Sequence, residues 1–124
     1  MDDREFFRKV AERAVLSVEE AADLTRATLQ TLADRLSNGE ARHLAEQLPD
    51  GLPGSLPKRE RIERFGLAEL LRRVSKHTGL NARETAAGVR AALTTLSETV
   101  DPDVFGHVMA QLPGEFRTMI GSRV

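Results

Sequence analysis

Apolar side chains recur along this chain at spacings of three and four residues, which is the period of an amphipathic α-helix. The longest such run extends from Val18 to Leu36, with apolar or small residues at positions 18, 22, 25, 29, 32 and 36. The same run returns at positions 82, 86, 89, 93, 96 and 100. Both runs predict long helices. We expect the most deeply buried side chains to lie near the two centres, at Leu29, Leu32, Leu93 and Leu96.

Shorter helices are predicted on either side of each long one. Before the long helices, apolar stripes are formed by Phe6, Phe7, Val10 and Ala14, and again by Leu70, Leu71 and Val74. After them, a third helix is predicted to end before Pro49 and Pro113, because proline cannot continue a helix. "GEFRTMI" at 114 to 120 predicts a short final helix with Phe116 and Ile120 on one side, whereas "DGLPGSLP" at 50 to 57 is expected to be a linker. No segment shows the alternation of apolar and polar residues that is typical of a β-strand.

Sequence signals for helix starts precede several of these segments. "SVEE" at 17 to 20, "SNGE" at 37 to 40 and "NARE" at 81 to 84 have the pattern of a capping box. In that motif the first side chain accepts from the amide three residues on, and the glutamate accepts from the first residue's amide. Asp101 is predicted as an N-cap, with Pro102 at the first helical position.

The chain also repeats itself in register. A shift of 64 residues pairs positions 5–56 with 69–120 without a gap, and 15 of these 52 pairs are identical. The identities include a histidine, a glutamine and a Leu-Pro stop, which chance alignment of two amphipathic helices does not explain, and we interpret them as an internal duplication. The predicted fold is all-α, with six to seven helices in two tandem three-helix units packed about a pseudo-twofold axis. We expect one domain over 1–124, with a first unit at 1–56, a linker at 57–66 and a second unit at 67–124.

Composition narrows the class of protein. With 40% hydrophobic and 30% charged residues, the chain should form a globular core and should need no cofactor to fold. The 18 basic and 19 acidic residues nearly cancel, so no long-range field draws it to nucleic acid or lipid. The absence of cysteine excludes disulfides and thiolate zinc sites. The charged opening "MDDREFFRKV" does not read as a signal peptide and no apolar run is long enough to span a membrane, so a cytoplasmic location is expected.

A pattern of Phe-x-x-Val-Ala, a long second helix and a Gln-Leu-Pro stop runs through both units. Its residues are Phe7, Val10, Ala11, Gln47, Leu48 and Pro49, then Leu71, Val74, Ser75, Gln111, Leu112 and Pro113. On this pattern the chain resembles the small bacterial proteins catalogued as domain of unknown function 2267. The resemblance implies a duplicated all-helical fold, and it implies no activity or catalytic residue.

The repeated polar residues His43, Gln47, His107 and Gln111 are the first candidate site. Glu40 and His43 are three residues apart, which is half of the motif found in carboxylate-bridged di-metal bundles. The second unit has Val104 in place of Glu40, so the motif is incomplete there, and no metal ligand is assigned. We expect each imidazole to cap or pack between the units and the glutamines to form hydrogen bonds near the axis.

The second candidate is a basic surface within residues 58–76, formed by Arg59, Arg61, Arg64, Arg72 and Arg73. Such a surface could contact a nucleic-acid backbone. We instead expect a solvated face with internal ion pairs and no aromatic side chain stacked among the arginines, and hence no sequence-specific DNA binding.

Signals for catalysis are missing from the sequence. Ser17 and Ser37 are explained as helix caps, and neither of the usual glycine-rich phosphate loops occurs. We therefore predict that the chain is not an enzyme but an interaction or scaffolding module, which acts through a helix groove between the units. Its partner would be a protein of unknown identity, and the chain would be a monomer or homodimer. The alternatives are a weak nucleic-acid or regulatory binder using residues 58–76 and, third, a metal-binding protein.

Overall fold

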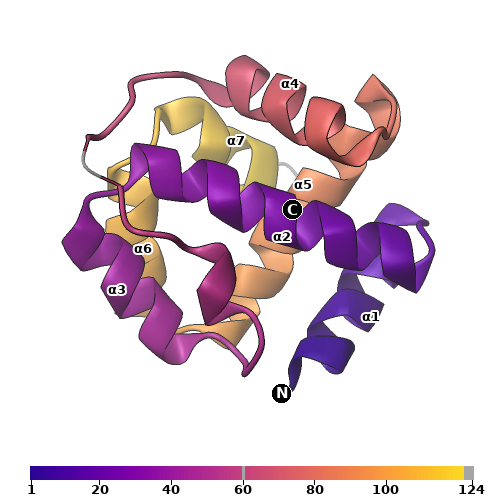
Figure 1. Cartoon of the computed structure of the whole chain (residues 1–124), viewed down its shortest axis with the longest axis horizontal. Helices are drawn as coiled ribbons and strands as arrows, with labels where there is room; N and C mark the ends of the chain where they lie inside the picture. The colour runs from indigo at the N-terminus through magenta and orange to yellow at the C-terminus, as the bar shows by residue number, and fades with distance from the viewer. Residues whose placement is uncertain (60, 122–124) are drawn as a thin grey trace.

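The computed structural model describes residues 1–59 and 61–121, and within these ranges it contains seven α-helices, one short 3-10 helix and no strand. The elements are α1 Asp3–Ala14, α2 Val18–Arg35, α3 Asn38–Gln47, η1 Pro53–Ser55, α4 Leu67–Thr78, α5 Ala82–Thr99, α6 Pro102–Ala110 and α7 Gly114–Gly121 (Figure 1). The all-α prediction is confirmed. No helix in the described part is long and apolar enough to cross a membrane.

Local signals set the ends of these helices. The Ser17 and Asn81 side chains accept from the amides of Glu20 and Glu84, whose carboxylates accept in return, so both predicted capping boxes are closed. Asp101 precedes α6 as predicted, with Pro102 in the first turn, but its side chain forms no capping hydrogen bond. Each local signal therefore places a helix start correctly, even where the hydrogen bond is missing.

The residues that directly follow α1 and α4 adopt the same unusual conformation. Val15 and Gly79 both have left-handed backbone angles, with φ of 57° and 79°. Glycine adopts this region readily, whereas a β-branched residue is strained there. Val15 is 89% exposed, so no packing of its side chain compensates for that strain.

The two long helices, α2 and α5, pack against each other and carry the rest of the fold. Helix α1 packs against α2 and against α5, while α4 packs against α5 and against α2 (Figure 1). Helix α3 lies against α6, and α7 contacts α5 and α6. The first helix of each half thus rests on the long helix of the other half, so the halves share one core.

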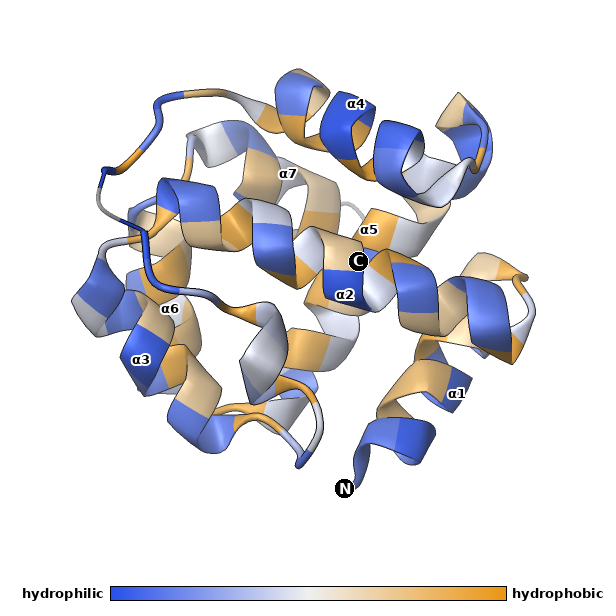
Figure 2. Ribbon diagram, viewed as in Figure 1, coloured by the Kyte–Doolittle hydropathy of each residue, from blue (hydrophilic) through white to orange (hydrophobic). Residues whose placement is uncertain are grey.

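The core follows the predicted stripes and extends beyond them (Figure 2). The four central leucines are buried as predicted, with exposed fractions of 3% or less at Leu29, Leu32, Leu93 and Leu96. Leu24, which the stripe omitted, is buried just as completely. Val18 is 47% exposed and Ala82 is also exposed, so the stripe is wrong at its first position. Both are the first residues of their helices and belong to the turns that follow α1 and α4.

The segment "DGLPGSLP" is not the free linker that its prolines and glycines predicted. It forms η1, and it buries Leu52 completely and Leu56 to 9% exposed. The Leu52 amide donates to the Pro49 carbonyl at 3.1 Å, just as the Phe116 amide donates to the Pro113 carbonyl at 3.1 Å. Leu52 therefore supplies to the core of the first half what Phe116 supplies to the second.

The contact between α2 and α5 depends on one pair of unequal side chains. A methyl group added at Gly88 would overlap the Leu24 side chain, and Leu24 is fully buried. Because the leucine has no free volume to move into, the glycine is required for the two helices to approach this closely.

We expect Gly88→Ala to lower the free energy of unfolding by about 1–3 kcal/mol, because overpacking outweighs the gain in helix propensity. The matched control is Gly106→Ala in α6, where an added methyl meets nothing, and this variant should gain about 0.5–1 kcal/mol. Urea unfolding followed by circular dichroism measures both. If Leu24 is the obstacle, Gly88→Ala should cost less in a Leu24→Ala background, and equal costs in the two backgrounds would contradict this explanation.

Candidate functional site

Gln47 and Gln111 each form a hydrogen bond to the opposite half of the chain. The Gln47 Oε1 atom accepts from the Asp101 amide at 2.6 Å, and the Gln111 Oε1 atom accepts from the Ser37 amide at 2.9 Å. Asp101 and Ser37 are the N-cap residues of α6 and α3. Each glutamine therefore satisfies an amide at the start of the third helix in the other half.

This bond replaces part of the capping box predicted at Ser37. The Ser37 hydroxyl accepts from the Glu40 amide at 3.3 Å, but the Ser37 amide donates to Gln111 and not to Glu40. Gln111 Nε2 also donates to the Ser37 hydroxyl at 3.1 Å. The capping-box prediction is thus half wrong, because a residue from the other half takes the position of Glu40.

The two histidines are not brought together with the glutamines. His43 and His107 are both exposed, so the expectation that their imidazoles pack between the units is wrong. Nor do they gather metal ligands, since residues 1–59 and 61–121 contain no group of three His, Asp or Glu side chains that could hold an ion. The repetition of these histidines has no structural explanation in the packing.

Arg59 and Arg73, from the predicted basic surface, are held by carboxylates of the same chain. Arg59 donates through Nε to Asp34 in α2 at 2.6 Å. Arg73 lies 2.8 Å from Glu63 and 3.3 Å from the same Asp34. These contacts fasten Arg59, from the segment between the halves, and Arg73, from α4, to α2. They match the expected internal ion pairs and leave these two guanidinium groups less available to a phosphate.

Arg72 and Arg73 share a third carboxylate. Two nitrogens of Arg72 donate to Glu69 at 2.8 and 2.7 Å, and Arg73 Nε donates to it at 2.8 Å. The hydrogen bonds from Arg72, then those from Arg73, lower the pKa of Glu69 from 4.5 to about 2. Glu69 in turn raises the pKa of both guanidinium groups.

Phe65 contradicts the expectation that no aromatic side chain stacks among the arginines. The Arg73 guanidinium lies 4.1 Å from the centre of its ring, and that of Arg35 lies 5.8 Å away. The Phe65 ring therefore already contacts two arginines of the same chain. Arg61 and Arg64 are exposed and form no ion pair with the described residues, while Glu60, an acid of the same segment, lies outside the described ranges.

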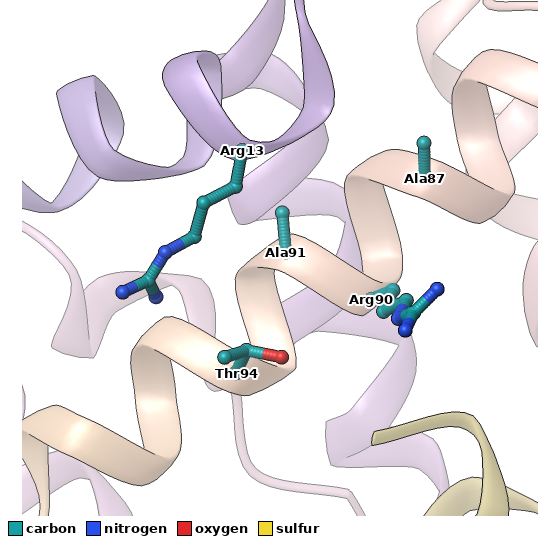
Figure 3. Close-up of a pocket in the computed structure, with 5 residues that line it drawn as sticks. All are labelled: Arg13, Ala87, Arg90, Ala91 and Thr94. Atoms are coloured by element: carbon teal, nitrogen blue, oxygen red, sulfur yellow. The ribbon is translucent and has the colours of Figure 1, made fainter. Parts of the chain in front are cut away.

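A shallow groove lies between α1 and α5, the first helix of one half and the long helix of the other. Its volume is about 270 Å³, and its lining consists of Arg13, Ala87, Arg90, Ala91 and Thr94. Figure 3 shows Ala91 between the two arginines and Ala87 one turn away along α5, with the two guanidinium groups pointing away from each other. The arrangement does not chelate one small anion, but it presents an extended floor of small side chains with a cation on each side.

The two arginines of the groove differ in their partners. Arg13 donates to the Thr95 hydroxyl at 2.9 Å and to both oxygens of Glu98 at 2.8 and 2.9 Å. Arg90 is half-buried and has no hydrogen bond or ion pair with any residue that the structure describes. Arg13 is therefore fixed in place, whereas Arg90 is available to an incoming acidic group.

The corresponding surface between α4 and α2 has different residues. Asp23, Gln30 and His77 stand where the groove has Ala87, Thr94 and Arg13. The small floor and the pair of arginines therefore belong to one side of the molecule only. No sequence motif marks the residues of this groove, although the change from Asp23 to Ala87 beside the repeated arginines Arg26 and Arg90 is visible in the aligned repeat.

The hydrogen bonds of Gln47 and Gln111 predict different losses of folding stability when each glutamine is replaced. We expect Gln111→Ala to lower the free energy of unfolding by about 1–2 kcal/mol, because it leaves the part-buried Ser37 amide without a partner. Gln47→Ala should cost about 0.5–1 kcal/mol, since the bond to Asp101 is exposed and water can replace it. Urea unfolding provides the measurement. Gln30→Ala is the control, because Gln30 forms no side-chain hydrogen bond with the described residues, and a shift of the same size for Gln30 and Gln111 would contradict the bridging role.

The lowered pKa of Glu69 predicts a pH-dependent stability. Because this pKa falls from 4.5 to about 2 on folding, the charged carboxylate stabilises the fold above about pH 4.5, and the contribution is lost as pH falls toward 2. The difference in urea midpoint between the wild type and Glu69→Gln should therefore shrink between pH 5 and pH 2. Glu5→Gln, at the aligned position of α1, removes a carboxylate without an ion pair among the described residues and should have a smaller effect at pH 7. A Glu69→Gln difference that stayed constant down to pH 2 would exclude this interaction.

Comparison with known proteins places the chain in a family. Residues 3–119 match the family described as an uncharacterized conserved protein (DUF2267), which confirms the resemblance seen in the sequence. A search of the curated proteins gives no match. The family description names no activity, so no site residue is transferred from it. Because the match covers nearly all of its 124 residues, the chain belongs to the DUF2267 family.

Proposed function

We propose that the chain is a non-catalytic interaction module built from two copies of one helical unit, and that the groove between α1 and α5 receives a helix of a protein partner. The pairing of contacts supports the two-copy arrangement, since α1 packs on α5 as α4 packs on α2. So do Gln47 and Gln111, which make the same bond in opposite directions across a pseudo-twofold axis.

The observation that carries the functional proposal is the floor of the groove. Ala87, Ala91 and Thr94 succeed one another along α5 over about 10 Å; Ala87 is exposed, whereas Ala91 and Thr94 lie at the bottom of the groove and are only 4% and 6% exposed. Small side chains let two helices approach to the near end of the usual 8–10 Å separation of their axes. A partner helix can therefore bury its own side chains against the α5 backbone between the arginine stems.

The charges of the walls favour an acidic partner. Arg90 has no carboxylate partner among the described residues, while Arg13 is already bonded to Glu98. A partner helix with an aspartate or glutamate along one edge would complete an ion pair with Arg90. At a rim of this kind such a pair contributes more to selectivity and association rate than to affinity.

The alternative of a nucleic-acid or regulatory binder has weaker support. Of the five arginines of the basic surface, Arg59, Arg72 and Arg73 are bonded to carboxylates of the chain itself. A phosphate backbone would have to displace those carboxylates. Only Arg61 and Arg64 would contact phosphates without such an exchange. Two phosphate contacts contribute little to electrostatic affinity for DNA.

Blocking the groove tests the proposal. A tagged chain is used to capture proteins from cells that normally produce it, and captured proteins are identified by mass spectrometry. We expect at least one protein to be retained by the wild type and lost with Ala87→Trp, whose indole covers the floor, and to be weakened by Arg90→Glu. The matched control, Ala110→Trp, lies at an exposed position of α6 outside the groove and should retain it. Identical captured sets from all four proteins would contradict docking between α1 and α5.

A further inference from the structure

A second groove lies between the consecutive helices α4 and α5. Its lining is more apolar than that of the groove between α1 and α5. Its volume is about 530 Å³, and Ala68, Leu71 and Ala82 form its apolar floor. This volume falls within the range of roughly 300–1,000 Å³ that is typical of small-molecule sites. The floor follows α4 from Ala68 to Lys76, a length of about 12 Å along the helix axis.

The hydroxyl groups of the floor are already bonded to the chain itself. Ser75 donates to the Leu80 carbonyl at 2.6 Å, and Thr85 donates to the Asn81 carbonyl at 2.8 Å. Neither hydroxyl is left to donate to a ligand in its present geometry. The floor thus favours a group that needs no hydrogen bond, such as an alkyl chain.

The aligned position in the first half is filled. Phe7 stands there in place of Leu71, is only 6% exposed and has the Arg26 guanidinium 5.0 Å from its ring centre. Val18 stands in place of Ala82. Two smaller side chains therefore open in the second half a space that the first half occupies with its own residues.

One end of this groove carries an unpaired cation. Lys76 is exposed and has no ion pair with any described residue, whereas Arg72, on the same rim, is bonded to Glu69. In the first half the residue aligned with Lys76 is the acidic Glu12. The apolar floor and the free ammonium group are together complementary to a chain-like ligand with an anionic end.

The geometry points to a binding site for a free, single-chain alkyl carboxylate in the groove between α4 and α5. The alkyl chain lies along Leu71 and the two alanines, and the carboxylate pairs with Lys76. This site is separate from the groove between α1 and α5, so it stands or falls independently of the proposed partner helix.

The experiment uses the whole chain and sodium decanoate below its micelle-forming concentration, followed by amide chemical shifts in nuclear magnetic resonance spectra. We expect saturable shifts at Ala68, Leu71 and Ala82 and none at Gly39 in α3. Shortening the chain to octanoate and hexanoate should weaken binding by about two- to fourfold per methylene group, as burial of the chain requires. The cationic decyltrimethylammonium ion should bind more weakly than decanoate.

Variants that carry first-half residues separate the chain from the charge. Leu71→Phe with Ala82→Val fills the groove and should weaken decanoate binding at least tenfold, while Ala110→Val, outside the groove, should leave it unchanged. Lys76→Glu should weaken decanoate about three- to tenfold and leave the neutral decanol unaffected. Thermal melting by circular dichroism checks the fold of each variant, and Lys76→Glu keeps the test decisive if the filled variant is unstable.

Several results would overturn this site. They are the absence of saturable shifts with decanoate, equal binding of decanoate and the cationic ion, and binding that neither groove variant weakens. Co-sedimentation with phosphatidylglycerol vesicles, without any response to monomeric decanoate, would instead assign the surface to membrane lipid and would equally exclude a site for the free carboxylate.

Discussion

Helices α2 and α5 approach each other as closely as they do because the Leu24 side chain fills the space that Gly88 leaves empty. In the proposed twofold arrangement, aligned positions of the two long helices meet near the axis. Two leucines at these aligned positions would collide, and two glycines would leave a cavity. One leucine facing one glycine, Leu24 against Gly88, fills the space without a clash. The rest of the fold depends on this contact, because α1 and α4 each rest on both long helices and both grooves run beside α5.

The strongly periodic segments could be predicted from the sequence, since burial of one helix face requires apolar residues at every third or fourth position. The ends of α2 and α5 followed equally from Ser17 and Asn81, whose capping hydrogen bonds are local. The burial of Leu24 did not follow, because a helix covered by three α-helices and η1 buries more than one stripe. The packing of "DGLPGSLP" against the core could not be predicted either, because turn residues predict the backbone conformation but not whether Leu52 reaches the core.

Predictions that depended on contacts between distant residues succeeded less well. The internal ion pairs of the basic surface were expected, but a count of charges within residues 58–76 includes the partners Glu63 and Glu69 and not Asp34, which lies in α2. Counting charges in a window omits such a partner. The prediction that the histidines pack between the units was wrong for a related reason. Spacing placed His43 one turn from Gln47, but a ten-residue helix packed mainly on α6 exposes one of them and turns the other toward Asp101.

Where two halves share one backbone plan, the positions at which they differ bear on the binding surfaces that we propose. Four such differences fall beside α5, and each removes bulk or acidity from the second half: Phe7 to Leu71, Val18 to Ala82, Asp23 to Ala87 and Glu12 to Lys76. None is needed for the core, since the first half folds with the larger or acidic residue at the same place. Loss of bulk from a surface exposes apolar area to water without any gain in packing, and that cost is recovered only when something else covers it. These differences support the proposal that the two grooves beside α5 are binding surfaces.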